Sequence, residues 1–188
     1  MTRFRTVVID PPWPVEPISV SAARKMRYGP SMRIPYRTID IDQITRFPIN
    51  DFADDQCALF MWTTQGFLKD ALNIVDLWGF KFARLLVWDK DDGINWLGFR
   101  NNGEFVVFAY RGKYPILIKP KGTIYTVFKV RRTRHSEKPV RFYDMIRNVT
   151  PEPRVDLFAR RRHYGFEAWG DQAEAPLITL ESYGQNNT

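Results

Sequence analysis

A short apolar strand that ends in Asp-Pro-Pro-Trp is the feature of this sequence with the clearest chemistry. Residues 6–9 are β-branched or apolar, and Asp10, Pro11, Pro12 and Trp13 follow them directly. In open α/β sheets, ligands bind just beyond the carboxyl ends of the strands, which is where these four residues fall. The two prolines fix φ and donate no backbone N–H, so their carbonyl groups form a rigid array of acceptors. Asp10 adds an anionic acceptor, and Trp13 adds a flat ring face.

These residue types suit an amino group attached to a heterocycle. One N–H would point to the Asp10 carboxylate and the other to the Pro11 carbonyl, while the base stacks on an aromatic ring. The lone pair of such an amine is delocalised into the ring, but two acceptors aimed at its protons favour a pyramidal nitrogen that can attack an electrophile. A sulfonium methyl donor would supply the electrophile, and Asp10 would stabilise the positive charge that develops on the nitrogen. This chemistry needs no metal. The tetrapeptide alone also fits a strand-ending turn whose Trp13 packs on the core.

The elements that must position these residues alternate between strands and helices, as in an α/β sheet. Apolar residues at helical spacing predict a helix over residues 67–78 that Gly79 ends in a left-handed cap. Pro139 favours the start of a second helix, and residues 150–153 indicate a turn. The segments expected to be strands are residues 6–9, 58–62, 82–88, 104–110, 123–130 and 155–159.

Two internal stretches and the end of the chain lack these patterns. Residues 14–35 contain four prolines and a basic cluster, which makes them a candidate lid. Residues 91–103 contain three glycines and are expected to form a loop. The final stretch, residues 173–188, turns polar, and we expect it to be partly disordered.

The composition is that of an ordinary soluble globular protein with a basic balance. Lys and Arg number 28 against 21 Asp and Glu, a net charge of +7 that favours a polyanionic partner. The single cysteine, Cys57, cannot form an internal disulfide, and no Cys/His cluster has the spacing of a zinc site. No apolar run is long enough for a membrane span, and the first residues do not resemble a signal peptide. We therefore expect a cytoplasmic protein in a reducing setting.

An ordered series of short motifs carries a family resemblance over residues 6–172. After Asp10-Pro11-Pro12-Trp13 the motifs are Pro35-Tyr36-Arg37-Thr38, Leu59-Phe60-Met61-Trp62-Thr63-Thr64, Val87-Trp88-Asp89-Lys90, Asn102-Gly103-Glu104, His135-Ser136-Glu137-Lys138-Pro139, Val155-Asp156-Leu157-Phe158-Ala159-Arg160 and Trp169-Gly170-Asp171-Gln172. With them the chain resembles the DPPW-type adenine N6-methyltransferases, the family of the eukaryotic messenger-RNA adenosine methyltransferase and its phage and bacterial DNA-modifying relatives.

The resemblance implies an α/β, Rossmann-like methyltransferase fold in one domain. Its permuted order places the catalytic half first, and its mostly parallel sheet carries helices on both faces. That domain would span residues 1–172, ahead of the tail at residues 173–188. The absence of any G-x-G-x-x-G motif agrees with the permuted order.

The resemblance also implies S-adenosylmethionine as the cofactor. Lys138 would meet its carboxylate, and a lysine at a helix entrance suits that charge, although a solvated capping charge is the ordinary interpretation of such a residue alone. An acidic residue in the last strand suits ribose hydroxyl groups. The residues that the resemblance assigns to the cofactor are Ser136, Lys138, Asp156, Phe158, Arg160, His163, Asp171 and Gln172.

On the substrate side, the resemblance places Tyr36 beside the target base and Glu104 and Trp62 at the pocket wall. Trp62, at a strand end, fits the core equally well. Two departures limit the transfer of roles. Because only nine residues precede Asp10, we expect no counterpart of the upstream segment that contacts the cofactor adenine in larger relatives. Residues 161–163 replace a less charged turn of the eukaryotic enzymes.

Three basic clusters flank the residues assigned to the site, and together they favour contact with a phosphate backbone. Any one of them alone could be a solvated basic face. The residues expected to contact nucleic acid are Arg24, Lys25, Arg27, Arg131, Arg132 and Arg134, and a further basic run covers residues 160–163.

Three functions remain open at the level of sequence. The first is adenine N6-methylation of DNA, because free-standing relatives of this size resemble phage or bacterial modification enzymes. The second is the same reaction on RNA. The third is a non-catalytic, nucleic-acid-binding partner subunit, which the intact Asp10-Pro11-Pro12-Trp13 disfavours. Neither a monomer nor a homodimer is specified.

Overall fold

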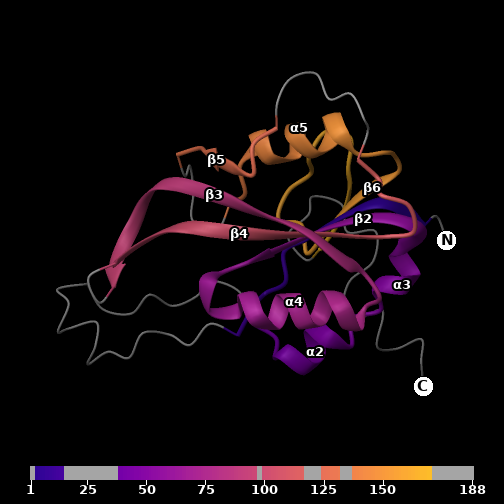
Figure 1. Cartoon of the computed structure of the whole chain (residues 1–188), viewed down its shortest axis with the longest axis horizontal. Helices are drawn as coiled ribbons and strands as arrows, with labels where there is room; N and C mark the ends of the chain where they lie inside the picture. The colour runs from indigo at the N-terminus through magenta and orange to yellow at the C-terminus, as the bar shows by residue number, and fades with distance from the viewer. Residues whose placement is uncertain (1–2, 15–37, 97–98, 117–123, 132–136, 171–188) are drawn as a thin grey trace. The chain divides into compact units, whose positions relative to one another are not determined.

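A seven-stranded sheet in the order β5-β3-β4-β2-β1-β6-β7 organises the chain (Figure 1). The computed structural model describes residues 3–14, 38–96, 99–116, 124–131 and 137–170. The chain divides into two compact units, of which the larger comprises Met1–Pro11 and Pro48–Thr188 and contains the whole sheet. The smaller unit, Pro12–Phe47, contains α2 (Ile41–Thr45), which begins with a capping box between Asp40 and Gln43.

The middle of the sheet is parallel and buried. β1 (Phe4–Ile9) lies between β2 (Ala53–Thr63) and β6 (Arg154–Leu157) and runs parallel to both. β7 (Glu167–Trp169) continues the sheet beside β6, again parallel. The last three residues of β1, Val7, Val8 and Ile9, are fully buried, as expected for a strand covered on both faces.

In the other half of the sheet one strand is reversed, so that its start lies at the edge where the other strands have their carboxyl ends. β4 (Phe99–Arg111) is antiparallel to both β2 and β3 (Lys81–Trp96), and β5 (Val127–Lys129) is parallel to β3. The directions therefore agree for every strand of the described sheet except β4.

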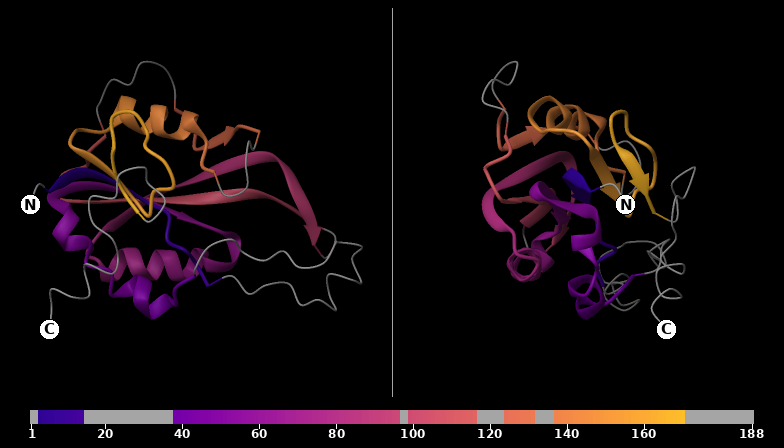
Figure 2. Two further views of the ribbon diagram at one scale, coloured as in Figure 1. Left: turned by 180° about the vertical axis from the view of Figure 1, so that it is seen from behind. Right: turned by 90° about the vertical axis from the view of Figure 1, so that its right-hand side faces the viewer.

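Helices cover both faces of this sheet. α4 (Leu68–Leu77) lies on one face and α5 (Val140–Val149) on the other, as the views in Figures 1 and 2 agree. Gly79 ends α4 at φ 78°, with the Phe80 and Gly79 N–H groups bonded back to the Val75 and Asp76 carbonyls. The short α3 (Ile49–Phe52) and the 3-10 turn Gln65–Phe67 complete the helical segments of the larger unit. Within the described residues, no helix has the length and hydropathy needed to cross a membrane.

Aromatic side chains dominate the core beneath α5. Trp62 meets Trp88 and Phe142 edge to face, with ring centroids 5.9 and 4.7 Å apart. Phe60 stacks on Phe108 at 4.7 Å. Such ring pairs add about 0.5–1.5 kcal/mol each to the area that they bury, so this cluster fixes the sheet to α5 close to the carboxyl end of β2.

The α/β fold class with a mostly parallel, Rossmann-like sheet is confirmed, but the loop expected at residues 91–103 is wrong. β3 continues to Trp96 and β4 begins at Phe99, and the two pair antiparallel from Ile94 opposite Asn101 to Trp96 opposite Phe99. The register shifts between Asp89 and Ile94, where Asp91 adopts φ 55°. The glycines in this stretch favour a loop, but cross-strand pairing extends both strands through it. The irregularity between Asp89 and Ile94 accommodates the change in register between β3 and β4.

Three shorter elements, α2, α3 and β7, were not expected from the sequence, and β5 is shorter than the strand predicted over residues 123–130. The candidate lid at residues 14–35 and the tail at residues 173–188 fall outside the described residues, apart from Pro14.

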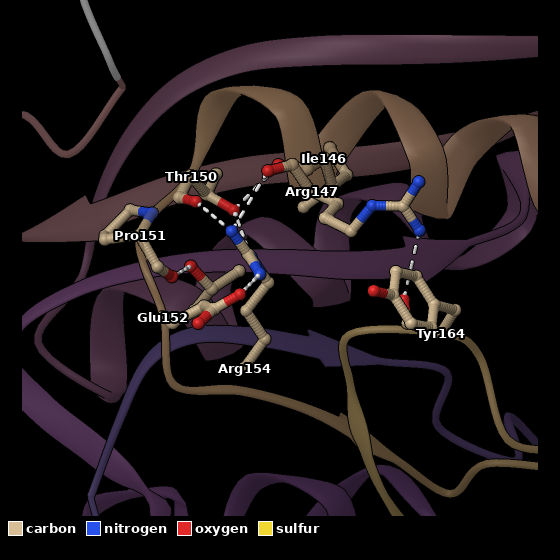
Figure 3. A network of polar contacts seen from close by, with 8 residues as sticks. Ile146, Arg147, Thr150, Pro151, Glu152, Arg154 and Tyr164 are labelled. Carbon is tan, nitrogen blue, oxygen red and sulfur yellow. Dashed lines mark hydrogen bonds and ion pairs between the residues drawn. The ribbon is translucent and has the colours of Figure 1, made fainter.

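Arg154 ties the C-terminal end of α5 to β6 (Figure 3). Its guanidinium, in a residue only 7% exposed, donates to the carbonyl groups of Arg147 and Thr150 at 3.0 and 2.6 Å and to the Glu152 carboxylate at 2.8 Å. The Thr150 hydroxyl donates in turn to the Ile146 carbonyl at 2.8 Å. These bonds satisfy carbonyl groups that the end of a helix leaves without partners.

We predict that Arg154→Met lowers the free energy of unfolding by about 2–4 kcal/mol, because buried carbonyl groups and Glu152 lose charge-assisted donors. Arg3→Met is the control, since Arg3 and Asp55 form an exposed ion pair at 3.4 Å; its effect should stay within about 0.5 kcal/mol. Urea denaturation measures both values. Equal losses for the two variants would contradict the structural role given to Arg154.

Candidate active site

Four charged side chains from four segments of the larger unit converge at the carboxyl end of β1. Asp10 directly follows β1, and its N–H donates to the Leu157 carbonyl at 3.3 Å, which extends the pairing of β1 with β6. Glu104 lies on β4, opposite Trp88 of β3. Lys90 is two residues further along β3, and Lys138 stands just before Pro139, the N-cap of α5.

These side chains form a chain of alternating charge. The Lys138 ammonium lies 3.2 Å from Asp10 Oδ1 and 2.9 Å from Glu104 Oε2. The other oxygen of Glu104, Oε1, is 3.2 Å from the Lys90 ammonium. All four side chains are less than a fifth exposed, between 12% and 18%. The sequence of charges is therefore negative, positive, negative, positive from Asp10 to Lys90.

The two inner members of this chain, Glu104 and Lys138, hold their charges firmly. Burial by itself would raise the pKa of Glu104, but the ammonium groups of Lys138 and Lys90 hold it down, at about 2. Burial would lower the pKa of Lys138, and the carboxylates of Asp10 and Glu104 instead raise it. Lys138 and Glu104 are thus both ionised across the ordinary pH range.

Asp10 is the carboxylate whose charge is least secured. Burial raises its pKa, and the negative charge of Glu104 adds to this, while Lys138 and Arg160 oppose it. Lys138 is shared, so Asp10 receives only part of its stabilisation. A carboxylate in this position is a strong acceptor that can also take up a proton.

Trp62 supports the site from below. It is fully buried, and the Lys138 ammonium lies 4.8 Å from the centroid of its ring. Such a cation–π contact holds the ammonium over the ring face. The sequence left open whether Trp62 lies in the core or at the pocket wall, and the structure places it in the core. Trp62 contacts the site through the Lys138 ammonium.

A second buried polar group, on β6 and α5, lies behind this chain of charges. The Tyr143 hydroxyl donates to Asp156 Oδ2 at 2.8 Å, and the His163 ring stacks on the Tyr143 ring with centroids 3.4 Å apart. Burial raises the pKa of Asp156 to about 8 although the Tyr143 bond opposes the shift. Burial and the nearby Arg161 lower the pKa of His163 to about 4. At neutral pH both side chains are therefore mostly uncharged.

The two other described residues assigned to the cofactor follow β6. Phe158 adopts φ 59°, a conformation uncommon for an aromatic residue, and its ring meets Trp169 edge to face at 5.6 Å. Arg160 is close enough to Asp10 to lower the pKa of its carboxyl. The structure thus brings Lys138, Asp10 and Arg160 to the same region of the sheet edge.

The other predicted site residues lie at the end of β1, in the smaller unit, after β5 or outside the described residues. Pro11 ends the first segment of the larger unit, whereas Pro12 and Trp13 belong to the smaller one, where the Pro12 carbonyl accepts from the Ile39 N–H at 3.0 Å. Arg131 follows β5 and is exposed. The predicted residues that lie outside the described ones are Arg24, Lys25, Arg27, Tyr36, Arg132, Arg134, Ser136, Asp171 and Gln172.

Sequence reasoning missed two side chains, Lys90 and Tyr143. Lys90 ends the Val87-Trp88-Asp89-Lys90 motif, which was part of the resemblance but carried no role. The register of β3 against β4, which places it beside Glu104, is not readable from that motif. Tyr143 is one of several apolar-face residues of α5, and only the structure distinguishes it as a donor to Asp156. Among the described residues, no group of three or more His, Cys, Asp or Glu side chains could hold a metal ion.

Comparison with known proteins identifies the family to which this chain belongs. A model of the family described as MT-A70 matches residues 4–172. The chain is a member of the MT-A70 family. The earlier resemblance to DPPW-type adenine N6-methyltransferases is thereby confirmed, and membership supports an enzyme that transfers methyl groups to adenine N6.

Three curated relatives show how far the MT-A70 similarity extends. The chain is 25% identical over 204 residues to the type II methyltransferase M.MunI of Mycoplasma sp, covering 97% of this chain and 83% of that protein. It is 27% identical over 169 residues to the human N(6)-adenosine-methyltransferase catalytic subunit METTL3, covering 84% of this chain and 26% of METTL3. A probable MT-A70-like N(6)-adenosine-methyltransferase of Oryza sativa subsp. japonica is 25% identical over 192 residues, 95% of this chain and 24% of the rice protein. The chain thus spans about a quarter of the length of the plant and human relatives.

We predict that Asp156→Asn raises thermal stability at pH 8 and that the gain shrinks toward pH 5. The pKa of Asp156 is raised from 3.8 in the unfolded chain to about 8 in the folded protein, so its contribution to stability is lost as the pH rises through this window. The amide oxygen of asparagine still accepts from Tyr143, and it cannot ionise. Melting curves at several pH values measure the effect.

Asp144→Asn is the matched control, because Asp144 lies on the same helix as Tyr143 but is about half exposed and pairs with Arg147 at 2.9 Å. Its melting temperature should differ from the wild type by a similar small amount at every pH. A pH-independent difference for Asp156→Asn as well would show that Asp156 is ionised in the folded protein and would contradict the prediction.

Proposed function

We propose that this protein transfers a methyl group from S-adenosylmethionine to the exocyclic N6 amine of adenine in DNA. The observation that carries the proposal is the Asp10 carboxylate at the carboxyl end of β1, inside the motif that marks the family, with the Lys138 ammonium 3.2 Å away. This edge of the sheet is where open α/β folds bind their ligands.

The charges at the sheet edge fit S-adenosylmethionine, which carries a carboxylate, an ammonium and a sulfonium group. Lys138 offers an ammonium for the carboxylate, while Asp10 and Glu104 offer negative charge toward the cationic groups. Asp156, Phe158, Arg160 and His163 would hold the rest of the cofactor. Ser136, Asp171 and Gln172 would complete the set, as the family resemblance implies.

When bound, S-adenosylmethionine supplies a methyl group made electrophilic by the sulfonium. Asp10 accepts one N–H of the adenine amine and the Pro11 carbonyl accepts the other, so that the nitrogen lone pair is aimed at the methyl carbon. Methyl transfer would form the N6–carbon bond, break the sulfur–carbon bond and leave positive charge on N6. Asp10 stabilises this charge and, because its pKa is raised by burial, it can receive the proton that the amine must release.

We propose that Lys138 loosens from Asp10 when the amine binds, because a carboxylate that is less tightly paired is a stronger acceptor. Its contact with Glu104, at 2.9 Å, gives the ammonium a second carboxylate to remain with. A buried ammonium left without a partner would be strongly unfavourable. The shared position of Lys138 therefore lets Asp10 become an acceptor for the amine without leaving an unpaired charge.

The choice of DNA is supported by the extent of the match to a type II methyltransferase. The match to the type II methyltransferase M.MunI covers 83% of that protein, whereas the match to METTL3 covers 26%. The net charge of +7 favours a polyanion of either kind. Methylation of adenosine in RNA, the reaction in the METTL3 name, is the second candidate.

The direct test offers the purified protein labelled S-adenosylmethionine together with single-stranded DNA, double-stranded DNA or RNA, and identifies the methylated nucleoside. We expect N6-methyldeoxyadenosine. Label found only in N6-methyladenosine of RNA would replace DNA with RNA as the substrate. Absence of transfer to any nucleic acid, by protein that binds the methyl donor, would instead favour a non-catalytic partner subunit.

We predict that Asp10→Asn lowers the rate of methyl transfer by about 10²–10³, the effect of removing one group that stabilises developing charge. The affinity for S-adenosylmethionine should stay within a few fold, because the substitution spares both Lys138 and the negative charge of Glu104. Asp55→Asn is the control, since the Asp55 side chain is 91% exposed. A near-normal rate for Asp10→Asn would remove Asp10 from the catalytic centre.

For Lys138→Met we predict a loss of S-adenosylmethionine affinity of about 10–100-fold, as expected when a buried charge-assisted contact is removed. Lys129→Met is the matched control, because Lys129 forms an exposed pair with Asp91 at 2.7 Å. Isothermal titration calorimetry measures both. Unchanged affinity in Lys138→Met would show that this ammonium does not meet the cofactor.

A further inference from the structure

Lys90 is the one member of the four-charge chain that no role has yet explained. It stands on β3, two residues past Trp88, whose partner across the ladder is Glu104. Its ammonium reaches Glu104 Oε1 at 3.2 Å, and its side chain is only 17% exposed. Keeping such an ammonium largely out of water has a cost in solvation, so its position beside Glu104 calls for a function.

Without Lys90, the local charge would not balance. Asp10 and Glu104 would then share a single close ammonium, that of Lys138, in a site where all of these side chains are mostly buried. Two carboxylates close to one cation cannot both stay ionised easily, because like charges at short range favour protonation of one of them. With Lys90 present, two carboxylates face two ammonium groups.

We propose that Lys90 is a positioning residue for methyl transfer: its ammonium keeps Glu104 ionised and in place, so that Lys138 is shared between Glu104 and Asp10 and can release Asp10 to the adenine amine. This inference rests on the proposed function, since it takes Asp10 as the acceptor for the amine. Lys90 acts through Glu104 and Lys138 and touches neither the base nor the cofactor.

Other charged groups that face this chain set the background against which Lys90 acts. Arg160, which follows β6, lowers the pKa of Asp10. Asp156 of β6 lies close enough that the charge of Asp10 raises the pKa of Asp156. Tyr143 of α5 is bonded to Asp156. Lys138 and Lys90 both lower the pKa of Glu104, so removal of Lys90 acts directly on Glu104.

The test compares the pH dependence of methyl transfer to DNA for wild type, Lys90→Met and Lys129→Met. For Lys90→Met we expect the acidic limb of kcat/KM to move to higher pH by about one unit, a tenfold loss at a fixed pH on that limb. The reason is that Asp10 and Glu104 then share the Lys138 ammonium alone, so that one of these two carboxylates takes up a proton more readily. Lys129→Met removes the same charge from an exposed pair on the neighbouring strand and should leave the limb in place.

Lys90→Arg should restore the wild-type limb, because a guanidinium supplies the same charge beside Glu104. A wild-type pH profile for Lys90→Met would overturn the proposal. So would a raised KM for DNA with an unshifted limb and a flatter salt dependence, because that result would mark Lys90 as a phosphate contact.

A measurement on the wild-type protein keeps the proposal falsifiable even if Lys90→Met does not fold. The carboxyl carbon of Glu104, followed by NMR, should report an ionised group at pH 4.5, where an ordinary glutamate is half protonated. Half protonation of Glu104 at that pH would overturn the proposal. This readout needs no turnover, so a wild-type protein that methylates no nucleic acid would refute the proposed function while the NMR result still decides whether Glu104 is held ionised.

Discussion

The sharing of one ammonium between two carboxylates is the interaction on which the site depends. Lys138 lies 3.2 Å from Asp10 and 2.9 Å from Glu104, above the ring of Trp62. If the ammonium were committed to Asp10 alone, that carboxylate would be a weaker acceptor for an incoming amine. If it were absent, two partly buried carboxylates would repel each other and one would be protonated. The shared position keeps Asp10 available and its raised pKa gives it the capacity to take up a proton.

The topology of the sheet is what places these charges together. β1 and β3 run in one direction and β4 in the other, so the end of β1, the continuation of β3 and the first part of β4 meet at one edge. α5 begins at the same edge, and its far end is tied to β6 by Arg154 and Thr150. The aromatic core beneath α5 fixes the height of Lys138 over the sheet.

The sequence predicted the central strands, both long helices and the edge of the sheet that carries Asp10, because continuous apolar runs and helical spacing report burial directly. It did not predict the long β3–β4 hairpin, since its glycines resemble a loop until the cross-strand ladder is known. The same lack of register hid Lys90, whose neighbour Glu104 is distant in sequence. Asp156 was assigned to the cofactor by resemblance, and no pattern in the sequence could show that it accepts a hydrogen bond from Tyr143 in the buried interior. Periodicity can be recognised within one segment of the sequence, whereas the register between two paired strands cannot.

The most direct test of the account is a crystal structure of the protein with S-adenosylhomocysteine and an adenine-containing oligonucleotide. The account predicts that the target amine donates to Asp10, that the sulfur of the ligand faces that amine, and that Lys138 has left Asp10 while remaining beside Glu104. A ligand bound at a distance from the end of β1, with Lys138 still paired to Asp10, would contradict it.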